Sequence, residues 1–289
     1  MGSACEIQAW LPQEIPDDVL AEIAQEAHRL EAKYSRYRED SVISRINQAA
    51  GHEPVEVDGE TAALLDFAAV GWEQSGGLFD ITSGILRRAW DFKSGHLPSQ
   101  QQIDTLLPLI GWDQVQWHAP SIFLPQPLME IDFGGVVKEY AVDRVAGLCL
   151  SRGLRHGLVN LGGDVHAFGP QLDGSPWMIG VQRPRGEGCR AAIPLLRGAL
   201  ATSGDYERFM DVDGVRYCHI LNPRTGWPCA EWQSVSVITP QCIVAGLAST
   251  VGMLKPRDEA SEWLRALDFP HLLLGDNVTH SHRLQPSDA

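Results

Sequence analysis

Residues 131–143 of the chain read IDFGGVVKEYAVD. The pattern predicts a strand that ends on an acid, a tight turn made by two glycines, and a helix with a lysine in its first turn. Glycines let a ligand approach the backbone, and the start of a helix offers unpaired N–H groups to an anion. An ordinary strand–turn–helix junction with a solvated lysine fits the segment equally well. It matches neither GxGxxG nor a P-loop.

Three more turns in the same half of the chain have a similar composition. They read VNLGGDV at 159–165, ATSGDY at 201–206 and HILNPRTGWP at 219–228. Each could simply connect two strands. Their number favours a small-molecule site, because α/β proteins place their sites on loops at strand ends. We therefore predict that the stretch from Asp132 to Thr250 holds the pyrophosphate of a dinucleotide.

The bulk composition limits the classes of partner. The chain has 289 residues and a net charge of −14, with 44% apolar and 21% charged residues. A nucleic-acid binder would need a basic face, so that class is discounted. Glycine turns can still bind an anionic dinucleotide through backbone N–H groups. The sequence shows no apolar run near the roughly 20 residues of a membrane span. It also shows no secretory leader, so we expect a cytoplasmic protein.

The spacing of apolar residues predicts a coarse order of elements. Helices are expected over 16–37, 41–50, 61–75, 136–152, 243–254 and 258–267. Strands are expected over 4–11, 115–117, 129–133, 157–161, 177–182, 198–202, 215–220 and 233–238. Strands that mostly follow one another, with helices interspersed irregularly, predict an α+β or mixed α/β fold. No linker stands out, so a single compact domain over 1–289 is expected.

Further segments complete a family pattern. They are MGS at 1–3, SRYREDSVISRIN at 35–47 and GLFDIT at 77–82. With the turns above, they resemble the ApbE family of FAD:protein FMN transferases in order and spacing over nearly the whole chain. Each motif is weak by itself, and it is their succession that carries the resemblance.

The resemblance implies a mixed α/β domain that binds FAD. Members of this family use magnesium to split the FAD pyrophosphate. They attach FMN through a phosphoester to a Thr or Ser of an acceptor protein and release AMP. Some members hydrolyse FAD to FMN and AMP instead. The expected partners are therefore FAD and a flavin-acceptor protein.

The resemblance also assigns site residues by position. His219 and Asp205 are the expected catalytic residues, with His219 as base or proton shuttle. The magnesium ligands that match are Thr250 and the backbone carbonyl of Val137. The expected flavin-binding residues are Tyr37, Asp80, Asp132, Gly134, Gly135, Lys138, Asp143, Gly162, Gly163, Asp164, Thr202, Ser203, Gly204 and Tyr206.

The sequence departs from the family pattern at three positions. The family has a metal-binding Asp four residues before the Thr that matches Thr250, which puts both side chains on one helix face. Gly246 stands there in this chain, and the loss of a charged ligand should weaken magnesium binding. Glu139 stands where the family usually has Gly. It could repel a pyrophosphate, or it could replace the missing ligand from the other side of the site. Ile81 replaces a frequent Pro, and we expect only a structural effect.

These departures leave more than one function open. A flavin transferase is the leading interpretation. The first alternative is a flavin-binding relative with weak or lost transferase activity, and Gly246 is the feature that separates it from the transferase. The second alternative is an FAD pyrophosphatase that uses water as the acceptor.

Overall fold

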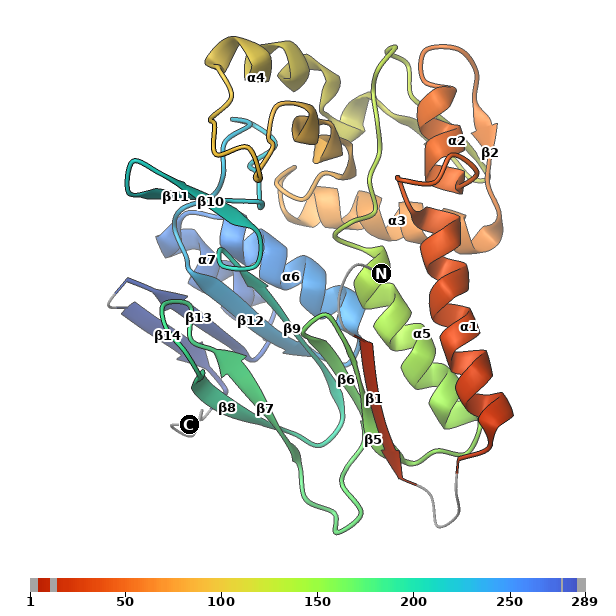
Figure 1. Ribbon diagram of the computed structural model, residues 1–289. Coiled ribbons are helices and arrows are strands. Elements are labelled where there is room, and N and C mark those ends of the chain that lie inside the picture. The colour runs from red at the N-terminus through yellow and green to blue at the C-terminus, as the bar shows by residue number, and fades with distance from the viewer. Residues whose placement is uncertain (1–4, 11–14, 277, 285–289) are drawn as a thin grey trace. The chain divides into compact units, whose positions relative to one another are not determined.

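The protein is described by a computed structural model that covers residues 5–10, 15–276 and 278–284 (Figure 1). It is a mixture of helices and strands, as the sequence predicts. The chain divides into two compact units, each made of segments far apart in the sequence. Unit 1 contains the residues up to Glu31 together with 137–204 and those from Glu231 onward. Unit 2 contains 32–136 and 205–230. The single domain expected from the sequence stays a prediction.

Unit 1 is built on a seven-stranded sheet in the order β1-β5-β6-β9-β12-β13-β14. Every neighbouring pair in it is antiparallel. The strands are β1 (Cys5–Trp10), β5 (His156–Leu161), β6 (Asp164–Gly169), β9 (Gly198–Gly204), β12 (Ser234–Thr239), β13 (His271–Gly275) and β14 (Val278–His282). Antiparallel pairing lets one face carry a helical layer and the other a different cover.

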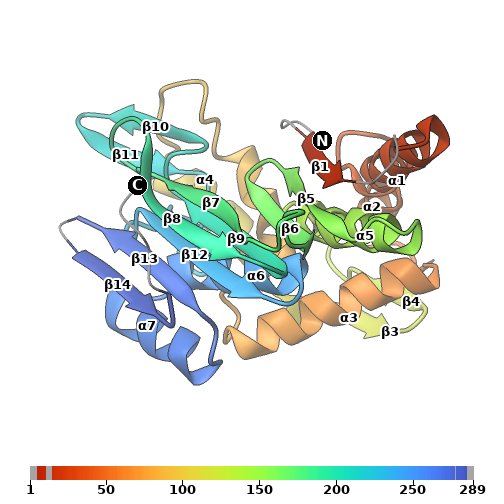
Figure 2. The same cartoon turned by 90° about the horizontal axis from the view of Figure 1, so that it is seen from below.

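Three helices and a hairpin cover this sheet on opposite faces (Figure 2). The helices are α5 (Val137–Ser151), α6 (Cys242–Leu254) and α7 (Arg257–Ala266), and the hairpin is β7 (Trp177–Gln182) with β8 (Cys189–Leu195). Side chains alternate along β9 accordingly. Leu200 joins the apolar cluster under the hairpin, whereas Ser203 bonds to hydroxyls on α6.

Unit 2 holds the remaining short elements. Its helices are α2 (Val42–Gln48), α3 (Gly59–Gln74) and α4 (Gln100–Leu106), and its 3-10 segments are η1 (Ile81–Arg88), η2 (Leu107–Leu109) and η3 (Trp112–Gln114). Its strands are β2 (Val55–Glu56), β4 (Ser121–Phe123) and β3 (Gln116–His118) in one sheet, with the hairpin β10 (Phe209–Val212) and β11 (Val215–Cys218).

A cluster of aromatic rings joins the two segments of unit 2. The ring of Trp90 lies 6.0 Å from that of Tyr217 and 5.3 Å from that of Trp227. The indole N–H of Trp90 also donates to the carbonyl of Gly226 at 2.8 Å. This pairs a buried polar group while the rings bury apolar area, and it fixes the chain just after β11.

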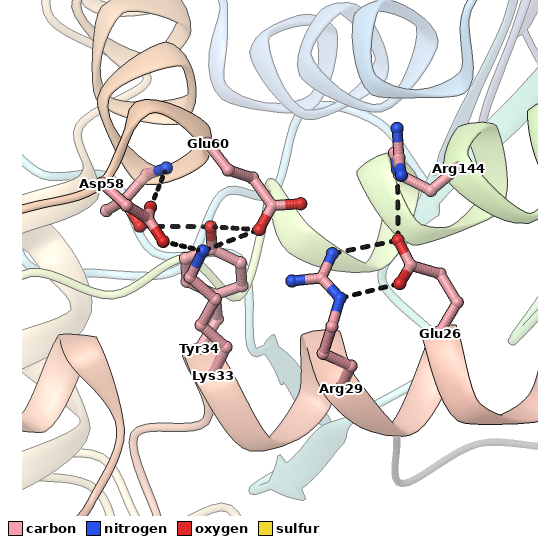
Figure 3. Close-up of polar contacts among 8 residues, drawn as sticks. Glu26, Arg29, Lys33, Tyr34, Asp58, Glu60 and Arg144 are labelled. Atoms are coloured by element: carbon pink, nitrogen blue, oxygen red, sulfur yellow. Dashed lines mark hydrogen bonds and ion pairs between the residues drawn. The ribbon is translucent and has the colours of Figure 1, made fainter.

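Helix α1 (Asp17–Tyr34) carries one ionic group within each unit (Figure 3). In unit 1, Glu26 accepts hydrogen bonds from Arg29 at 2.7 Å and from Arg144 of α5 at 3.1 Å. In unit 2, Lys33 donates to Asp58 at 2.5 Å and to Glu60 at 2.7 Å. Both groups link α1 to elements distant in sequence, and partial exposure limits what each contributes to stability.

Most predicted helices and strands are confirmed, with ends that differ by a few residues. The predicted strand over 129–133 is wrong. Its backbone N–H groups do not bond to a neighbouring strand. The N–H of Ile131 donates to the Asn47 side chain and that of Asp132 donates to the carbonyl of Ile81, both at 2.8 Å. Residues 1–3, and the ends of the predicted strand 4–11, lie outside the described part of the chain.

The buried side chain of His271 on β13 makes the stability of unit 1 depend on pH. Its Nδ1 lies 2.8 Å from the carbonyl oxygen of Phe269, and its ring stacks on His282 at 5.5 Å. Burial lowers the pKa of His271, and the nearby His282, Arg265 and His280 add to the decrease.

We predict that the free energy of unfolding falls more steeply below about pH 6.5 in the wild type than in His271→Phe. The unfolded chain takes up a proton near the ordinary histidine pKa of 6.5, whereas folded His271 resists it. Urea denaturation at about pH 7.5 and about pH 5.5 measures the difference. Equal losses in the two proteins would contradict the prediction.

Candidate functional site

The two-residue turn between β5 and β6 presents an acid to the interior of unit 1. Gly162 and Gly163 have φ values of 63° and 93°, and Leu161 pairs directly with Asp164. Tight hairpin turns with two positive φ values favour glycine at both positions. The N–H of Gly163 donates to the side chain of Asn160 at 2.9 Å. The glycine pair thus fixes where Asp164 enters the unit.

Asp164 is held by two elements of the same unit. Its side chain is 4% exposed. One carboxylate oxygen accepts the N–H of Thr202 on β9 at 3.1 Å, and the other is bound by the ammonium of Lys138. Lys138 lies in the first turn of α5, as predicted. Burial opposes its charge, but Glu139 and Asp164 outweigh that effect and raise the pKa of Lys138 above its usual value.

Glu139 is the second acid beside Lys138. Its side chain is 8% exposed, and Oε1 lies 3.3 Å from the Lys138 ammonium. Burial raises the pKa of Glu139 to about 7; Lys138 opposes the rise and Asp164 adds to it. Within the part of the chain that the structure describes, no hydrogen-bond donor reaches Oε2.

Hydroxyl groups on β9 and α6 form the adjoining part of this site. Ser203 lies within hydrogen-bond distance of Ser249, at 2.8 Å, and of Thr250, at 3.2 Å. Thr202 bonds to Ser236 on β12 at 2.8 Å. Ser249 also donates to the carbonyl of Gly246 at 3.0 Å. These oxygens are neutral, hard ligands of the kind that magnesium accepts.

Asp143 has a structural role that the sequence did not predict. Its two carboxylate oxygens accept the N–H groups of Cys242, at 2.7 Å, and Ile243, at 3.0 Å. One of them also bonds to Nδ1 of His166 at 2.7 Å. The local N-cap residue, Gln241, makes no side-chain capping bond. An acid on α5 therefore caps α6, where a negative charge also complements the helix dipole.

We predict that Asp143→Ala lowers the free energy of unfolding by about 1–2 kcal/mol, because two helix N–H groups lose their acceptor. Urea denaturation provides the measurement. A matched control is Asp173→Ala, since Asp173 accepts one bond from the Ser175 N–H in an exposed loop. A decrease no larger than that of the control would show that Asp143 does not hold α6.

In unit 2, Asp132 organises the turn before α5. Its carboxylate accepts the N–H of Gly134 at 3.0 Å and pairs with Arg36. Arg36 in turn donates to the hydroxyl of Tyr37 at 2.9 Å, and the Tyr37 ring is 80% exposed. A Cβ at Gly84 would lie 2.4 Å from the Asp132 Cβ, so this turn needs a glycine beside it. The exposed ring and arginine can stack on or bind a ligand.

Asp80 is occupied by structural bonds. It caps η1 by accepting the N–H and the hydroxyl of Thr82, at 2.8 and 2.6 Å, and it accepts the N–H of Trp112 at 2.9 Å. Burial raises its pKa despite these bonds. Its predicted flavin-binding role stays a prediction, but the geometry already accounts for an acid here.

The predicted catalytic pair also lies in unit 2. His219 directly follows β11, and its Nδ1 lies 3.2 Å from the carbonyl oxygen of Arg208. A tautomer that donates from Nδ1 leaves its proton-accepting lone pair on Nε2. Asp205 is buried, and burial raises the pKa of the neighbouring Tyr206 to about 12, with Glu207 and Asp205 adding to the rise.

The structure groups the predicted site residues by unit. Unit 1 holds Val137, Lys138, Asp143, Gly162, Gly163, Asp164, Thr202, Ser203, Gly204 and Thr250. Unit 2 holds Tyr37, Asp80, Asp132, Gly134, Gly135, Asp205, Tyr206 and His219. Sequence reasoning missed Arg36, His166 and Ser249. Arg36 lies within the quoted segment 35–47, and Ser249 directly precedes the predicted ligand Thr250.

Among residues 5–10, 15–276 and 278–284, no three His, Cys, Asp or Glu side chains are grouped to hold a metal. A cation in unit 1 would therefore need hydroxyl, carbonyl or substrate oxygens as well as a carboxylate. No described helix is long and apolar enough to cross a membrane. Unit 1 thus combines an antiparallel sheet with a helix-borne lysine, buried acids and hydroxyls, and such groups can bind phosphate oxygens.

A comparison with known proteins identifies the family of this chain. The family model of ApbE matches residues 1–272. The chain belongs to the ApbE family.

Related proteins and structures agree with this placement. The chain is 28% identical over 292 residues to the FAD:protein FMN transferase of Treponema pallidum, which covers 93% of this chain and 80% of the relative. It is 31% identical to that of Klebsiella pneumoniae, over 81% of this chain and 75% of the relative. The ApbE protein of Thermotoga maritima is similar in structure, with a TM-score of 0.91 and 33% identity over 98% and 94% of the two chains. The flavin transferase ApbE of Vibrio cholerae gives a TM-score of 0.89 at 26% identity, with the same coverage.

Proposed function

We propose that this protein is an FAD:protein FMN transferase. It moves FMN from FAD to a Thr or Ser hydroxyl of an acceptor protein and releases AMP. The observation that carries this proposal is the buried set of Lys138, Asp164 and Glu139 beside the hydroxyls of Ser203 and Thr250. The relatives are named as flavin transferases, and these side chains could catalyse that reaction.

The reaction is a phosphoryl-group transfer. The acceptor oxygen attacks the phosphorus on the FMN side of the pyrophosphate and forms a new P–O bond. The P–O bond to the AMP phosphate breaks, and AMP leaves with its electron pair. The hydroxyl proton passes to a base. The acceptor ends as an FMN phosphoester, so the charge that develops on the bridging oxygen is what the protein must stabilise.

Lys138 is suited to binding the phosphate oxygens. Its ammonium lies in the first turn of α5, where backbone N–H groups also favour an anion. The raised pKa keeps it charged throughout the physiological range. Lys138 therefore binds and orients the pyrophosphate, while Asp164 holds the ammonium in place.

Magnesium is the expected metal, and the residues present fit a hard cation. Two oxygen atoms are suited as ligands. One is Oε2 of Glu139, which is buried and accepts no hydrogen bond from the described residues, and the other is the hydroxyl oxygen of Thr250. The carbonyl of Val137, expected as a ligand from the resemblance, belongs to the same unit. When bound, a magnesium ion neutralises charge on the pyrophosphate and so favours attack by the acceptor oxygen.

His219 is the proposed base. Its Nδ1 faces a carbonyl oxygen, which favours a proton on that nitrogen and leaves Nε2 to accept the proton of the acceptor hydroxyl. Asp205, the second catalytic residue that the resemblance implies, is buried in the same unit. The cytoplasmic location expected from the sequence stays a prediction.

We predict that His219→Gln lowers kcat for FMN transfer by about 100- to 10,000-fold while KM for FAD changes little. The assay incubates the protein with FAD, Mg²⁺ and a threonine-containing acceptor protein, and it follows fluorescent FMN on the acceptor together with released AMP. The control His52→Gln alters another exposed histidine of unit 2 and should leave the rate unchanged.

Other outcomes of the same assay assign a different function. Release of AMP without an acceptor protein would identify an FAD pyrophosphatase. Binding of FAD with no AMP under either condition would identify a flavin-binding relative without transferase activity. Wild-type kcat in His219→Gln would exclude His219 as the base.

A further inference from the structure

Glu139 and Gly246 compete for one small volume in unit 1. Helices α5 and α6 pack side by side (Figure 1). A Cβ placed on Gly246 would lie 2.5 Å from the Cγ of Glu139, 3.1 Å from its Cδ and 3.4 Å from its Cβ. The first distance is far inside van der Waals contact, so a side chain at 246 and the observed Glu139 exclude each other. The glycine on α6 is what admits the acid from α5.

The carboxylate that enters this space is incompletely satisfied. Glu139 is 6% exposed, and its Oε2 is buried with no hydrogen-bond partner among the residues that the structure covers. Its Oε1 lies 3.3 Å from the Lys138 ammonium, which is also bound to Asp164. Buried carboxylate oxygens normally have partners, since leaving one unpaired costs about 1–3 kcal/mol or more. A missing partner is therefore indicated at Oε2.

The charges of this set indicate what kind of partner is missing. Two buried carboxylates, on Glu139 and Asp164, share one ammonium, that of Lys138. The thiol of Cys242 interacts with all three, and its pKa is raised well above its usual value by burial and by the acids Asp164, Glu139 and Asp143. Two carboxyl groups facing one ammonium in a desolvated site favour a further cation. Hard oxygen ligands favour a divalent one such as Mg²⁺.

Thr250 lies on the same side of α6 as Gly246, one turn further along. Residues four apart on a helix face the same way. Ser249 donates to the Gly246 carbonyl, and the hydroxyl of Ser203 lies 3.2 Å from that of Thr250, so hydroxyls lie within one turn of Gly246. A cation bound to Oε2 would thus have a neutral oxygen ligand available on α6.

We infer that Glu139 is the carboxylate ligand of the divalent cation in this protein, and that it reaches the site from α5 over Gly246. The family resemblance implies an acid on α6 at position 246 and a glycine on α5 at position 139. In this chain the glycine is at 246 and the acid is at 139, so the carboxylate comes from the other helix. This inference rests on the proposed function, which supplies the reason for a cation.

Metal binding tests the inference without turnover. Metal-free protein is titrated with Mn²⁺, with and without saturating FAD, and bound Mn²⁺ is measured by calorimetry and by loss of the free-ion EPR signal. Glu139→Gln keeps the side-chain volume and removes the charge. We expect its Kd for Mn²⁺ to be about tenfold higher or more, because even outer partners of metal sites contribute that much.

A matched control removes a similar charge elsewhere in unit 1. Glu26 is 15% exposed and paired with Arg29 and Arg144 (Figure 3). Glu26→Gln should bind Mn²⁺ with wild-type affinity. If Glu139→Gln also binds as the wild type does, or if the wild type binds no Mn²⁺ in either condition, the inference is overturned.

The exchanged pair of residues supplies a second test that does not depend on the stability of one variant. Gly246→Asp alone should lower the Tm, because its Cβ meets Glu139. Glu139→Gly combined with Gly246→Asp should recover both the Tm and the Mn²⁺ affinity, because a carboxylate then enters from α6. A double variant whose Tm stays low would contradict the shared volume, and one with no affinity for Mn²⁺ would contradict the exchange of the ligand. A wild-type protein that binds Mn²⁺ as expected but transfers no FMN would instead reject the proposed function alone.

Discussion

One ammonium shared by two buried carboxylates is the interaction on which the site in unit 1 depends. Lys138 binds Asp164 from the β5–β6 turn and lies beside Glu139 on its own helix. Burying either carboxylate so far from water would be costly without this ammonium. The arrangement ties the start of α5 to the sheet and places two carboxyl groups beside one ammonium. In the proposed function, the lysine binds phosphate oxygens and the second carboxyl group binds a cation.

The surrounding packing keeps this charge set in place. Asp143, one turn further along α5, caps α6 and so fixes the helix that carries Gly246 and Thr250. The close approach of α5 and α6 at Gly246 leaves room for only one side chain, and Glu139 takes it. Stability and chemistry are coupled here, because a change at either residue alters both the packing and the net charge.

The sequence predicted the parts of this account that depend on local pattern. The two-glycine motifs predicted the turn before Asp164 and the start of α5. Glycine favours the positive φ found at Gly162 and Gly163, and the first turn of a helix has unpaired N–H groups. Family resemblance located Lys138, Thr250 and the departure at Gly246. The sequence did not predict contacts between residues that are far apart in the chain. The strand expected over 129–133 bonds instead to an asparagine side chain and to η1. The capping role of Asp143 joins residues about a hundred positions apart, which no periodicity reveals. For the same reason the sequence could offer Glu139 as a replacement for the ligand missing at Gly246, but it could not show that the two positions share one volume.

An anomalous difference map of crystals grown with Mn²⁺ and FAD would show where the cation binds. We expect a peak within coordination distance of the Glu139 carboxylate and the Thr250 hydroxyl. A peak bound elsewhere, with Glu139 still facing only Lys138, would contradict this expectation.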